Sequence, residues 1–117
     1  MCLGACVLTA LTAQNTQGVS GVYEVTPQFI SEQISTVCTD LEVSAVKIGM
    51  LRRPEIIEAV ADSLDQNSIG HIVLDPVMVA KSGDALLVDE AVSALKSILI
   101  PKASIITPNI PEAAKLL

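Results

Sequence analysis

The chain has 117 residues, half of them apolar, and a formal net charge of −6 at neutral pH. This length suits one domain with one modest core, which must be aliphatic because the chain has one Phe, one Tyr and no Trp. The acidic charge and the lack of a basic stripe exclude a nucleic-acid backbone as the expected partner.

The first thirteen residues, MCLGACVLTALTA, carry no charge. A secretory signal would need a positive region before the apolar stretch, and a membrane span would need about 20 apolar residues, so we expect neither. The cysteines are odd in number and lack paired zinc-site spacing, which favours small buried thiols in a reducing compartment. The sequence therefore predicts a cytoplasmic domain that begins with a buried strand.

Short apolar runs alternate with helical patterns along the chain. Four runs are too continuous for half-exposed antiparallel strands and predict buried parallel strands: residues 6–13, 44–50, 71–75 and 104–108. Three segments repeat apolar residues at three- and four-residue steps, as helices do: residues 29–41, 56–64 and 88–99. Pro27 and Pro54 stand where a helix can begin, and residues 21–25 predict a short extra strand. Right-handed crossovers then predict one α/β domain over residues 1–117, a parallel sheet with helices on both faces.

Polar groups follow the predicted strands, at the carboxyl ends where open α/β sheets bind ligands. These exits read QNT at 14–16, GML at 49–51, DPVMVAKSGD at 75–84 and TPNIPE at 107–112. Gln14 can both donate and accept, so it can read an amide-like or pyrimidine edge, and Met50 offers an adaptable apolar wall. Asp75 and Glu112 are hard oxygen ligands of the kind that Mg²⁺ prefers beside phosphate. The sequence therefore predicts a site for a small polar ligand at this edge.

Four of these motifs together resemble one enzyme family. TALTAQNTQGV, KIGML, LDPVMVAKSGD and ITPNIPEA are similar, in the same order, to the hydroxymethylpyrimidine and phosphomethylpyrimidine kinases of thiamine biosynthesis, which are ribokinase-like. The resemblance implies ATP-dependent phosphorylation of 4-amino-5-hydroxymethyl-2-methylpyrimidine and its monophosphate, with Mg²⁺. It implies Gln14, Met50 and Val77 for the pyrimidine, Asn109 and Glu112 (N-x-x-E) for nucleotide phosphate, and Asp75 with Glu112 for the metal.

The chain also departs from the family pattern. It lacks the amino-terminal Gly-rich segment that closes over the substrate, and the Gly-Thr-Gly anion hole that stabilises the transferring phosphoryl group. A Walker-type G-x-x-x-x-G-K is absent as well. We therefore expect the central portion of a longer kinase domain, with no catalytic group identified in it and no turnover by these 117 residues alone.

Each candidate residue also has a structural interpretation. Asn109 and Glu112 form a good capping-box sequence, in which Gln could replace Glu at a cost below about 1 kcal/mol. Asp75 can end a strand by accepting turn amides, and Gln14 can be an ordinary turn residue. Lys47 interrupts an apolar strand and is expected to be paired or to extend to solvent.

Two other functions stay open. A pyridoxal-type kinase of the same superfamily would suit DPVM and TPN-x-x-E equally well. A non-catalytic α/β binding domain would account for the missing phosphate loop. The sequence predicts small-molecule partners and no membrane partner, and it leaves the oligomeric state open, a homo-oligomer included.

Overall fold

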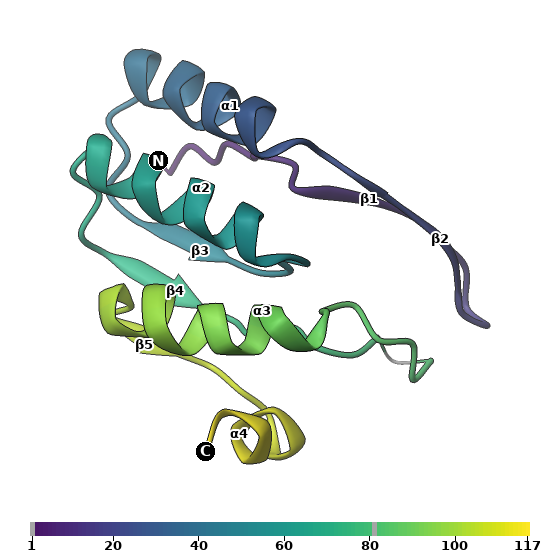
Figure 1. Ribbon diagram of the computed structural model, residues 1–117. Coiled ribbons are helices and arrows are strands. Elements are labelled where there is room, and N and C mark those ends of the chain that lie inside the picture. The colour runs from purple at the N-terminus through teal and green to yellow at the C-terminus, as the bar shows by residue number, and fades with distance from the viewer. Residues whose placement is uncertain (1, 81) are drawn as a thin grey trace.

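A parallel sheet flanked by helices organises the protein, as the computed structural model shows for residues 2–80 and 82–117 (Figure 1). The α/β class predicted from the sequence is confirmed. Lys81, which the sequence predicts to be solvated, lies outside the described residues. Three short strands pair in parallel in the order β3 (Val46–Ile48), β4 (Ile72–Leu74) and β5 (Ile105–Ile106).

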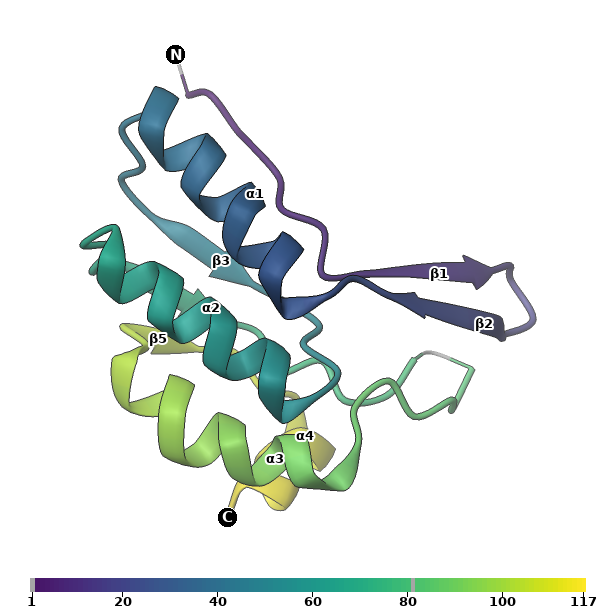
Figure 2. The ribbon, with the colours of Figure 1, turned by 45° about the horizontal axis from the view of Figure 1, so that its top comes forward.

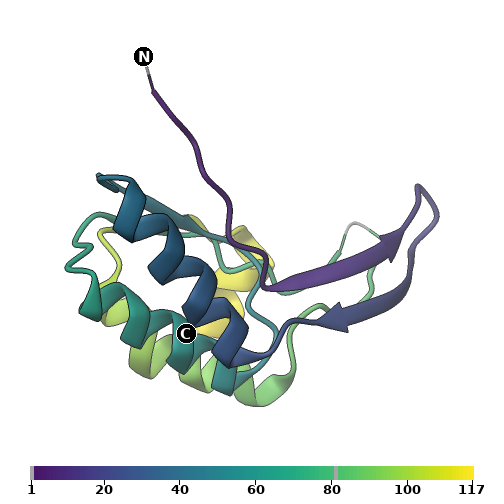
Figure 3. The ribbon, with the colours of Figure 1, turned by 90° about the horizontal axis from the view of Figure 1, so that it is seen from above.

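Helices lie side by side over one face of this sheet (Figure 3). They are α1 (Pro27–Asp40), α2 (Pro54–Gln66) and α3 (Asp89–Ala94), with the shorter α4 (Ile110–Leu116) following β5. Both α1 and α2 begin at the predicted prolines, and the Thr26 hydroxyl caps α1 by accepting from the Phe29 amide at 3.3 Å. None of the described helices is long and apolar enough to cross a bilayer.

The predicted helix at residues 88–99 changes geometry along its length. After α3 the chain continues as a π-helical turn, η1 (Leu95–Leu99), and then as a 3₁₀ turn, η2 (Ile100–Lys102). Pro101 lacks an amide proton and its ring crowds the preceding turn, so an α-helix cannot continue through it. The segment therefore widens at η1, tightens at η2 and ends before β5.

The core fills the layer between the helices and the covered face of the sheet. Its fully buried side chains are aliphatic, as the composition requires, and include Ile30, Ile57, Leu64, Leu74, Leu95 and Leu99. On the opposite face, the strand register places Lys47, Val73 and Ile105 in one row. Ile105 is 57% exposed, so this face is the less covered one within the described residues.

The predicted first strand, residues 6–13, does not join the parallel sheet. Instead β1 (Ala10–Gln14) pairs antiparallel with β2 (Val19–Glu24) in a hairpin that reaches away from the helices (Figure 2). The expectation of a buried parallel strand is wrong here, since Leu11 is 48% exposed. A hairpin needs only a short turn, whereas a parallel partner needs a long crossover, and the extra strand predicted at 21–25 supplies the nearby partner.

The segment before β1 is also exposed. Leu3 is 75% exposed, and both Cys2 and Cys6 are exposed free thiols, so the expectation of buried cysteines is wrong for these two. Leu8 is held against α1, because the Gln33 side chain accepts from its amide and donates to its carbonyl oxygen at 2.9 Å each. The Gln33 amide group thus takes the place of a neighbouring strand.

Candidate functional site

The segments that follow β3, β4 and β5 lie next to one another. The Asp75 amide donates to the Ile48 carbonyl at 2.8 Å, and the Thr107 amide donates to the Leu74 carbonyl at 3.0 Å. The exits of all three strands are therefore joined by main-chain hydrogen bonds at one edge of the sheet. Met50 and Val77, the two predicted apolar wall residues, both lie at this edge and are half-buried.

Gln14 lies farther out, at the end of β1 on the hairpin. Its strand partner is Val19, and its side chain is exposed and takes part in no hydrogen bond among the described residues. The hairpin is anchored at its base, where the Thr9 hydroxyl donates to the Met50 carbonyl at 2.9 Å. Five residues of extended chain, about 16 Å, separate Thr9 from Gln14. The position of Gln14 relative to Met50 thus depends on how the hairpin is held.

Asp75 follows β4 with a side chain that is 32% exposed. Its carboxylate faces Lys47, with 3.6 Å between Oδ2 and Nζ, and the Lys47 side chain is 69% exposed, so the prediction that Lys47 is paired or extends to solvent is confirmed. The Val77 amide donates to the main-chain carbonyl of Asp75 at 2.8 Å, and among residues 2–80 and 82–117 no amide donates to the Asp75 side chain. The carboxylate therefore keeps oxygen lone pairs toward solvent at the strand exit.

Glu112 is the most buried carboxylate of the site, at 8% exposure. The capping box is present: Glu112 Oε2 accepts from the Asn109 amide at 3.0 Å, and Asn109 Oδ1 accepts from the Glu112 amide at 2.9 Å. Glu112 Oε1 also accepts from the Met78 amide, at 3.4 Å. This third bond ties the start of α4 to the loop after β4, and sequence spacing alone did not indicate it.

The loop after β4 folds back on itself. Val79 and Ala85 form an antiparallel bridge, and the Leu86 amide donates to the Met78 carbonyl at 2.9 Å. Gly83 closes the turn with φ of +92°, a conformation that glycine adopts without strain. The KSGD sequence of this loop thus supplies a glycine where the backbone needs one.

Asp84 joins this loop to the hairpin. Its Oδ2 accepts from the Val19 amide at 3.1 Å and from the Ser82 hydroxyl at 2.5 Å. These bonds hold the pKa of Asp84 below its ordinary value of 3.8, first through the Ser82 hydroxyl and then through the Val19 amide. Sequence reasoning missed this residue, because its partner lies 65 positions away.

Because the pKa of Asp84 is lowered, its contact with the Val19 amide should persist at neutral pH and weaken only in acid. The pKa of Asp84 is lower in the folded than in the unfolded protein. The ionised carboxylate therefore stabilises the fold above pH 3.8, and this stabilisation is lost as the pH falls through the folded pKa. Protection of the Val19 amide from hydrogen exchange, corrected for the intrinsic rate, should therefore stay constant between about pH 5 and 8. A fall in corrected protection within that range would contradict the prediction.

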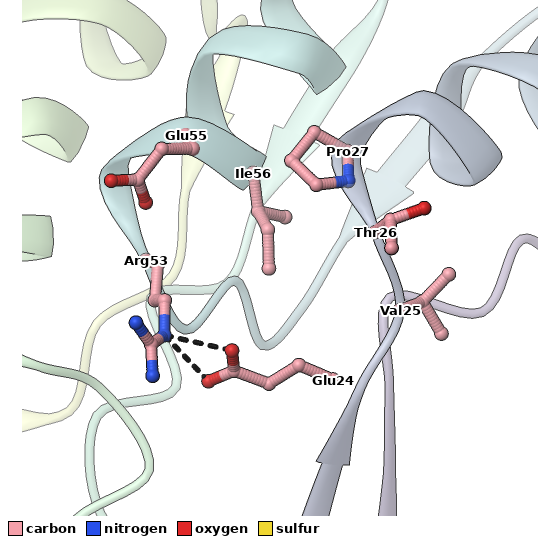
Figure 4. Close-up of a pocket in the computed structure, with 7 residues that line it drawn as sticks. All are labelled: Glu24, Val25, Thr26, Pro27, Arg53, Glu55 and Ile56. Atoms are coloured by element: carbon pink, nitrogen blue, oxygen red, sulfur yellow. Dashed lines mark hydrogen bonds and ion pairs between the residues drawn. The ribbon is translucent and has the colours of Figure 1, made fainter.

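The base of the hairpin carries a compact charge cluster, of which Figure 4 shows the pair formed by Glu24 and Arg53. Glu24, the last residue of β2, accepts from Arg52 Nε at 2.9 Å and from Arg53 Nε at 2.8 Å. The pKa of Arg53 is raised, first through its hydrogen bond with Glu24 and then through the charge of that carboxylate. The cluster joins β2 to the start of α2, and the sequence analysis did not single out any of its three residues.

Two cavities accompany these segments. One, of about 310 Å³, lies at the hairpin base and is lined by Glu24, Val25, Thr26, Pro27, Arg53, Glu55 and Ile56 (Figure 4). The other, of about 410 Å³, is lined by Met78, Ala85, Leu87, Asp89, Val92, Ser93, Lys96 and Lys115. Neither contains a residue predicted for the pyrimidine, the phosphate or the metal. The candidate site therefore lies at the exits of β3, β4 and β5, which carry all the predicted residues except Gln14.

Replacing Glu24 with Gln should loosen the hairpin base. The side chains of Glu24, Arg52 and Arg53 are 26–54% exposed, so solvent screens both ion pairs and the global free energy of unfolding should change little. Amide exchange in β1 and β2 should accelerate, and added salt should reduce the difference between variant and parent. Glu55→Gln is the matched control, since Glu55 lines the same cavity but makes no ion pair among the described residues. Equal exchange in both variants would contradict the prediction.

A comparison with known protein families identifies the family of this chain. The model of the family described as phosphomethylpyrimidine kinase matches residues 1–117. The chain belongs to the phosphomethylpyrimidine kinase family. The resemblance based on four short motifs is thereby confirmed over the whole length of the sequence.

Individual members of the family are close in sequence and structure. The chain is 52% identical to hydroxymethylpyrimidine/phosphomethylpyrimidine kinase of Escherichia coli strain K12 over 114 residues, 97% of the chain and 43% of that protein. A crystal structure of phosphomethylpyrimidine kinase from Clostridium difficile 630 superposes with a TM-score of 0.88 at 47% identity. The superposition covers 97% of the present chain and 49% of that structure. The chain thus spans less than half the length of these relatives.

A pyridoxal kinase shares the fold at lower identity. The ADP complex of Bacillus subtilis pyridoxal kinase superposes with a TM-score of 0.77 at 34% identity, over 94% of the chain and 42% of that structure. The fold is therefore common to the two kinds of kinase, while the sequence of this chain is more similar to that of the phosphomethylpyrimidine kinase.

The residues at the strand exits of this family member fit a Mg²⁺ ion shared with phosphate. Within residues 2–80 and 82–117, no cluster of three or more Asp, Glu, His or Cys could hold a metal. Mg²⁺ commonly uses one or two carboxylates together with water and substrate phosphates, so two carboxylates such as Asp75 and Glu112 would be enough in number. Asp75 has the more accessible oxygens, whereas both oxygens of Glu112 already accept backbone amides.

Proposed function

We propose that the protein phosphorylates 4-amino-5-hydroxymethyl-2-methylpyrimidine and its monophosphate with ATP in thiamine biosynthesis. We further propose that residues 1–117 are the central portion of a longer kinase domain. The observation that carries the proposal is the 52% identity to a named kinase of this type over 97% of the chain. The three joined strand exits support it as well, because open α/β sheets bind ligands at this edge. The three free cysteines suit a location in the reducing cytoplasm.

Substrate positioning is the first task assigned to these residues. Gln14 would pair with the aminopyrimidine edge, because its amide can donate to a ring nitrogen and accept from the exocyclic amine. Met50 and Val77 would pack on the ring faces, since both lie half-buried at neighbouring exits. Phosphoryl transfer depends mainly on such positioning and on charge neutralisation.

The phosphate side is the second task. The capping box of Asn109 and Glu112 fixes the start of α4, and the Met78 bond fixes the loop after β4 against it. Asp75 would contact Mg²⁺ through its accessible oxygens, with Glu112 supporting the same region. When bound, Mg²⁺ would neutralise charge on the transferring phosphoryl group.

A kinetic comparison of two substrates tests the proposal. The complete polypeptide that contains this chain, free of host kinases, should form ADP from ATP with hydroxymethylpyrimidine at a much higher kcat/KM than with pyridoxal. A higher kcat/KM with pyridoxal would favour the pyridoxal-type kinase, which the shared fold supports. Binding of either compound without any ADP formation would favour a non-catalytic binding domain. The second and third outcomes would both overturn the proposal.

Gln14→Leu should weaken pyrimidine binding selectively. Leucine keeps much of the volume but removes the amide, which leaves the ring edge unpaired at a cost of about 1–3 kcal/mol. In the complete enzyme, KM for hydroxymethylpyrimidine should rise about 5- to 150-fold, while KM for ATP stays near the parent value. The matched control is Gln17→Leu, an exposed turn residue of the same hairpin. If Gln14→Leu and Gln17→Leu give the same KM, Gln14 is only a turn residue.

A further inference from the structure

The outer end of the hairpin is held by a residue outside the hairpin. Its turn is closed internally, with the Asn15 side chain accepting from the amides of Gln17 and Gly18 at 2.9 and 3.1 Å. The Val19 amide, however, donates to Asp84 Oδ2 in the loop after β4. Val19 is the strand partner of Gln14. The contact from the loop therefore falls opposite the residue proposed to read the pyrimidine.

The local backbone explains why an external acceptor is used there. The pairing of β1 with β2 shifts register between Ala13 and Gln14, so that Gln14 pairs with Val19 and Ala13 pairs with Gly21. A register shift disrupts the hydrogen-bond ladder locally and leaves a main-chain group for another partner. An exposed two-stranded hairpin is also only marginally stable by itself. A second attachment point at its outer end would fix the direction of the whole β1–β2 hairpin.

The fit between the two segments is close. A methyl group on Gly18 would lie 3.3 Å from Asp84 Oδ2, which is tighter than most side-chain contacts, and at an ordinary contact distance of 3.8 Å from Ser82 Cβ. The Ser82 hydroxyl donates to the same carboxylate oxygen, and the Ala80 amide donates to the Asp84 carbonyl at 2.8 Å. Contacts within the loop thus orient the Asp84 carboxylate independently of its contact with the hairpin. Figures 2 and 3 both show this loop beside the outer part of the hairpin.

We propose that Asp84 is a positioning residue for the pyrimidine, which fastens the loop after β4 to the hairpin and so fixes the position of Gln14 relative to the strand exits. The loop begins at Asp75 and carries Val77, so one side-chain contact fixes two parts of the proposed pyrimidine site relative to each other. Glu24 holds the hairpin base through Arg52 and Arg53, and Asp84 holds the outer end. This role rests on the proposed function for its substrate, while the fastening itself does not.

The test uses the complete polypeptide and compares Asp84→Ala and Asp84→Asn with the parent. Alanine removes the acceptor, and asparagine keeps one neutral oxygen, so we expect the larger effect from alanine. Hydrogen exchange at Val19 should accelerate by about tenfold or more in Asp84→Ala, because the amide loses its acceptor. KM for hydroxymethylpyrimidine should rise about two- to tenfold, with KM for ATP and kcat near the parent values. Asp62→Ala, an exposed carboxylate on α2, is the control for loss of charge.

A double-variant comparison tests the contact geometry. Gly18→Ala should raise the same KM in the parent, since its methyl group would press on the carboxylate, and should have a smaller effect when Asp84 is already alanine. Equal effects in both backgrounds would show that the two residues do not meet.

Three results are distinguishable. Unchanged exchange at Val19 in Asp84→Ala would overturn the fastening. Faster exchange with an unchanged KM would overturn the positioning role while leaving the fastening in place. If the parent does not phosphorylate the pyrimidine at all, the proposed function fails and the positioning role falls with it, while the exchange result still decides the fastening.

Discussion

Ile57→Ala is expected to lower the free energy of unfolding by about 2–5 kcal/mol. Ile57 is completely buried on α2, and α2 lies between α1 on one side and α3 with η1 on the other. Truncation removes apolar surface from the centre of this layer and leaves a cavity that three helices would have to close. Folded domains are stable by only about 5–15 kcal/mol, so the loss would be a large part of the total.

The measurement is urea unfolding followed by circular dichroism, with two control variants. Ile57→Val removes one methyl group and should cost about 0.5–1.5 kcal/mol, and Glu58→Ala, at an exposed neighbour on the same helix, should stay within about 0.5 kcal/mol. A loss below about 1 kcal/mol in Ile57→Ala would show that the helices repack freely around the site. Such a core would be less tightly packed than the burial of Ile57 indicates.

Local patterns predicted the regular parts of the fold well. The apolar spacing and the prolines at 27 and 54 placed α1 and α2, and the continuous runs placed β3, β4 and β5. The capping box at Asn109 and Glu112 was also predicted correctly. These features depend on neighbours within a few residues, which is the range over which sequence periodicity and capping act.

The failures have a different origin. Residues 6–13 read as a buried strand, since an uninterrupted apolar run does not reveal whether its partner is a distant parallel strand or a neighbouring antiparallel one. The contacts that shape the site were missed because they join distant positions: 65 residues separate Val19 from Asp84, and 34 separate Met78 from Glu112. Their side chains are ordinary loop and cap residues in sequence, and only the fold brings them to their partners.

Glu112→Ala is expected to lower the free energy of unfolding by about 2–4 kcal/mol. The substitution removes the capping-box acceptor, worth about 1 kcal/mol, and it leaves the Met78 amide without its acceptor. Met78 is only 2% exposed, so water cannot easily replace the carboxylate, and an unsatisfied buried donor costs about 1–3 kcal/mol. The effect should exceed that of Asn109→Ala, which removes the other half of the cap alone.

Glu112→Gln should now cost more than a capping box alone predicts. A capping glutamine needs only one accepting oxygen, but here two oxygens accept from two different amides, those of Met78 and Asn109. Glutamine would turn its NH₂ group toward one of these donors, so one bond is lost and two donors face each other. We expect a loss of about 1–3 kcal/mol, between the parent and the alanine variant.

The same variant separates the structural role of Glu112 from its proposed role beside Mg²⁺. A neutral amide is a poorer ligand than a carboxylate, so a metal-supporting Glu112 predicts a raised Mg²⁺ requirement and a rate about tenfold lower in the complete enzyme. Asn109→Ser, which keeps a capping hydroxyl, is the control for movement of α4 without loss of the carboxylate. If Glu112→Gln melts at a lower temperature but its kinase rate has the parent Mg²⁺ titration, the carboxylate acts only by holding Met78 and Asn109. A shifted Mg²⁺ titration that Asn109→Ser does not reproduce would support a metal within reach of Glu112, because Asn109→Ser disturbs the cap but keeps the carboxylate.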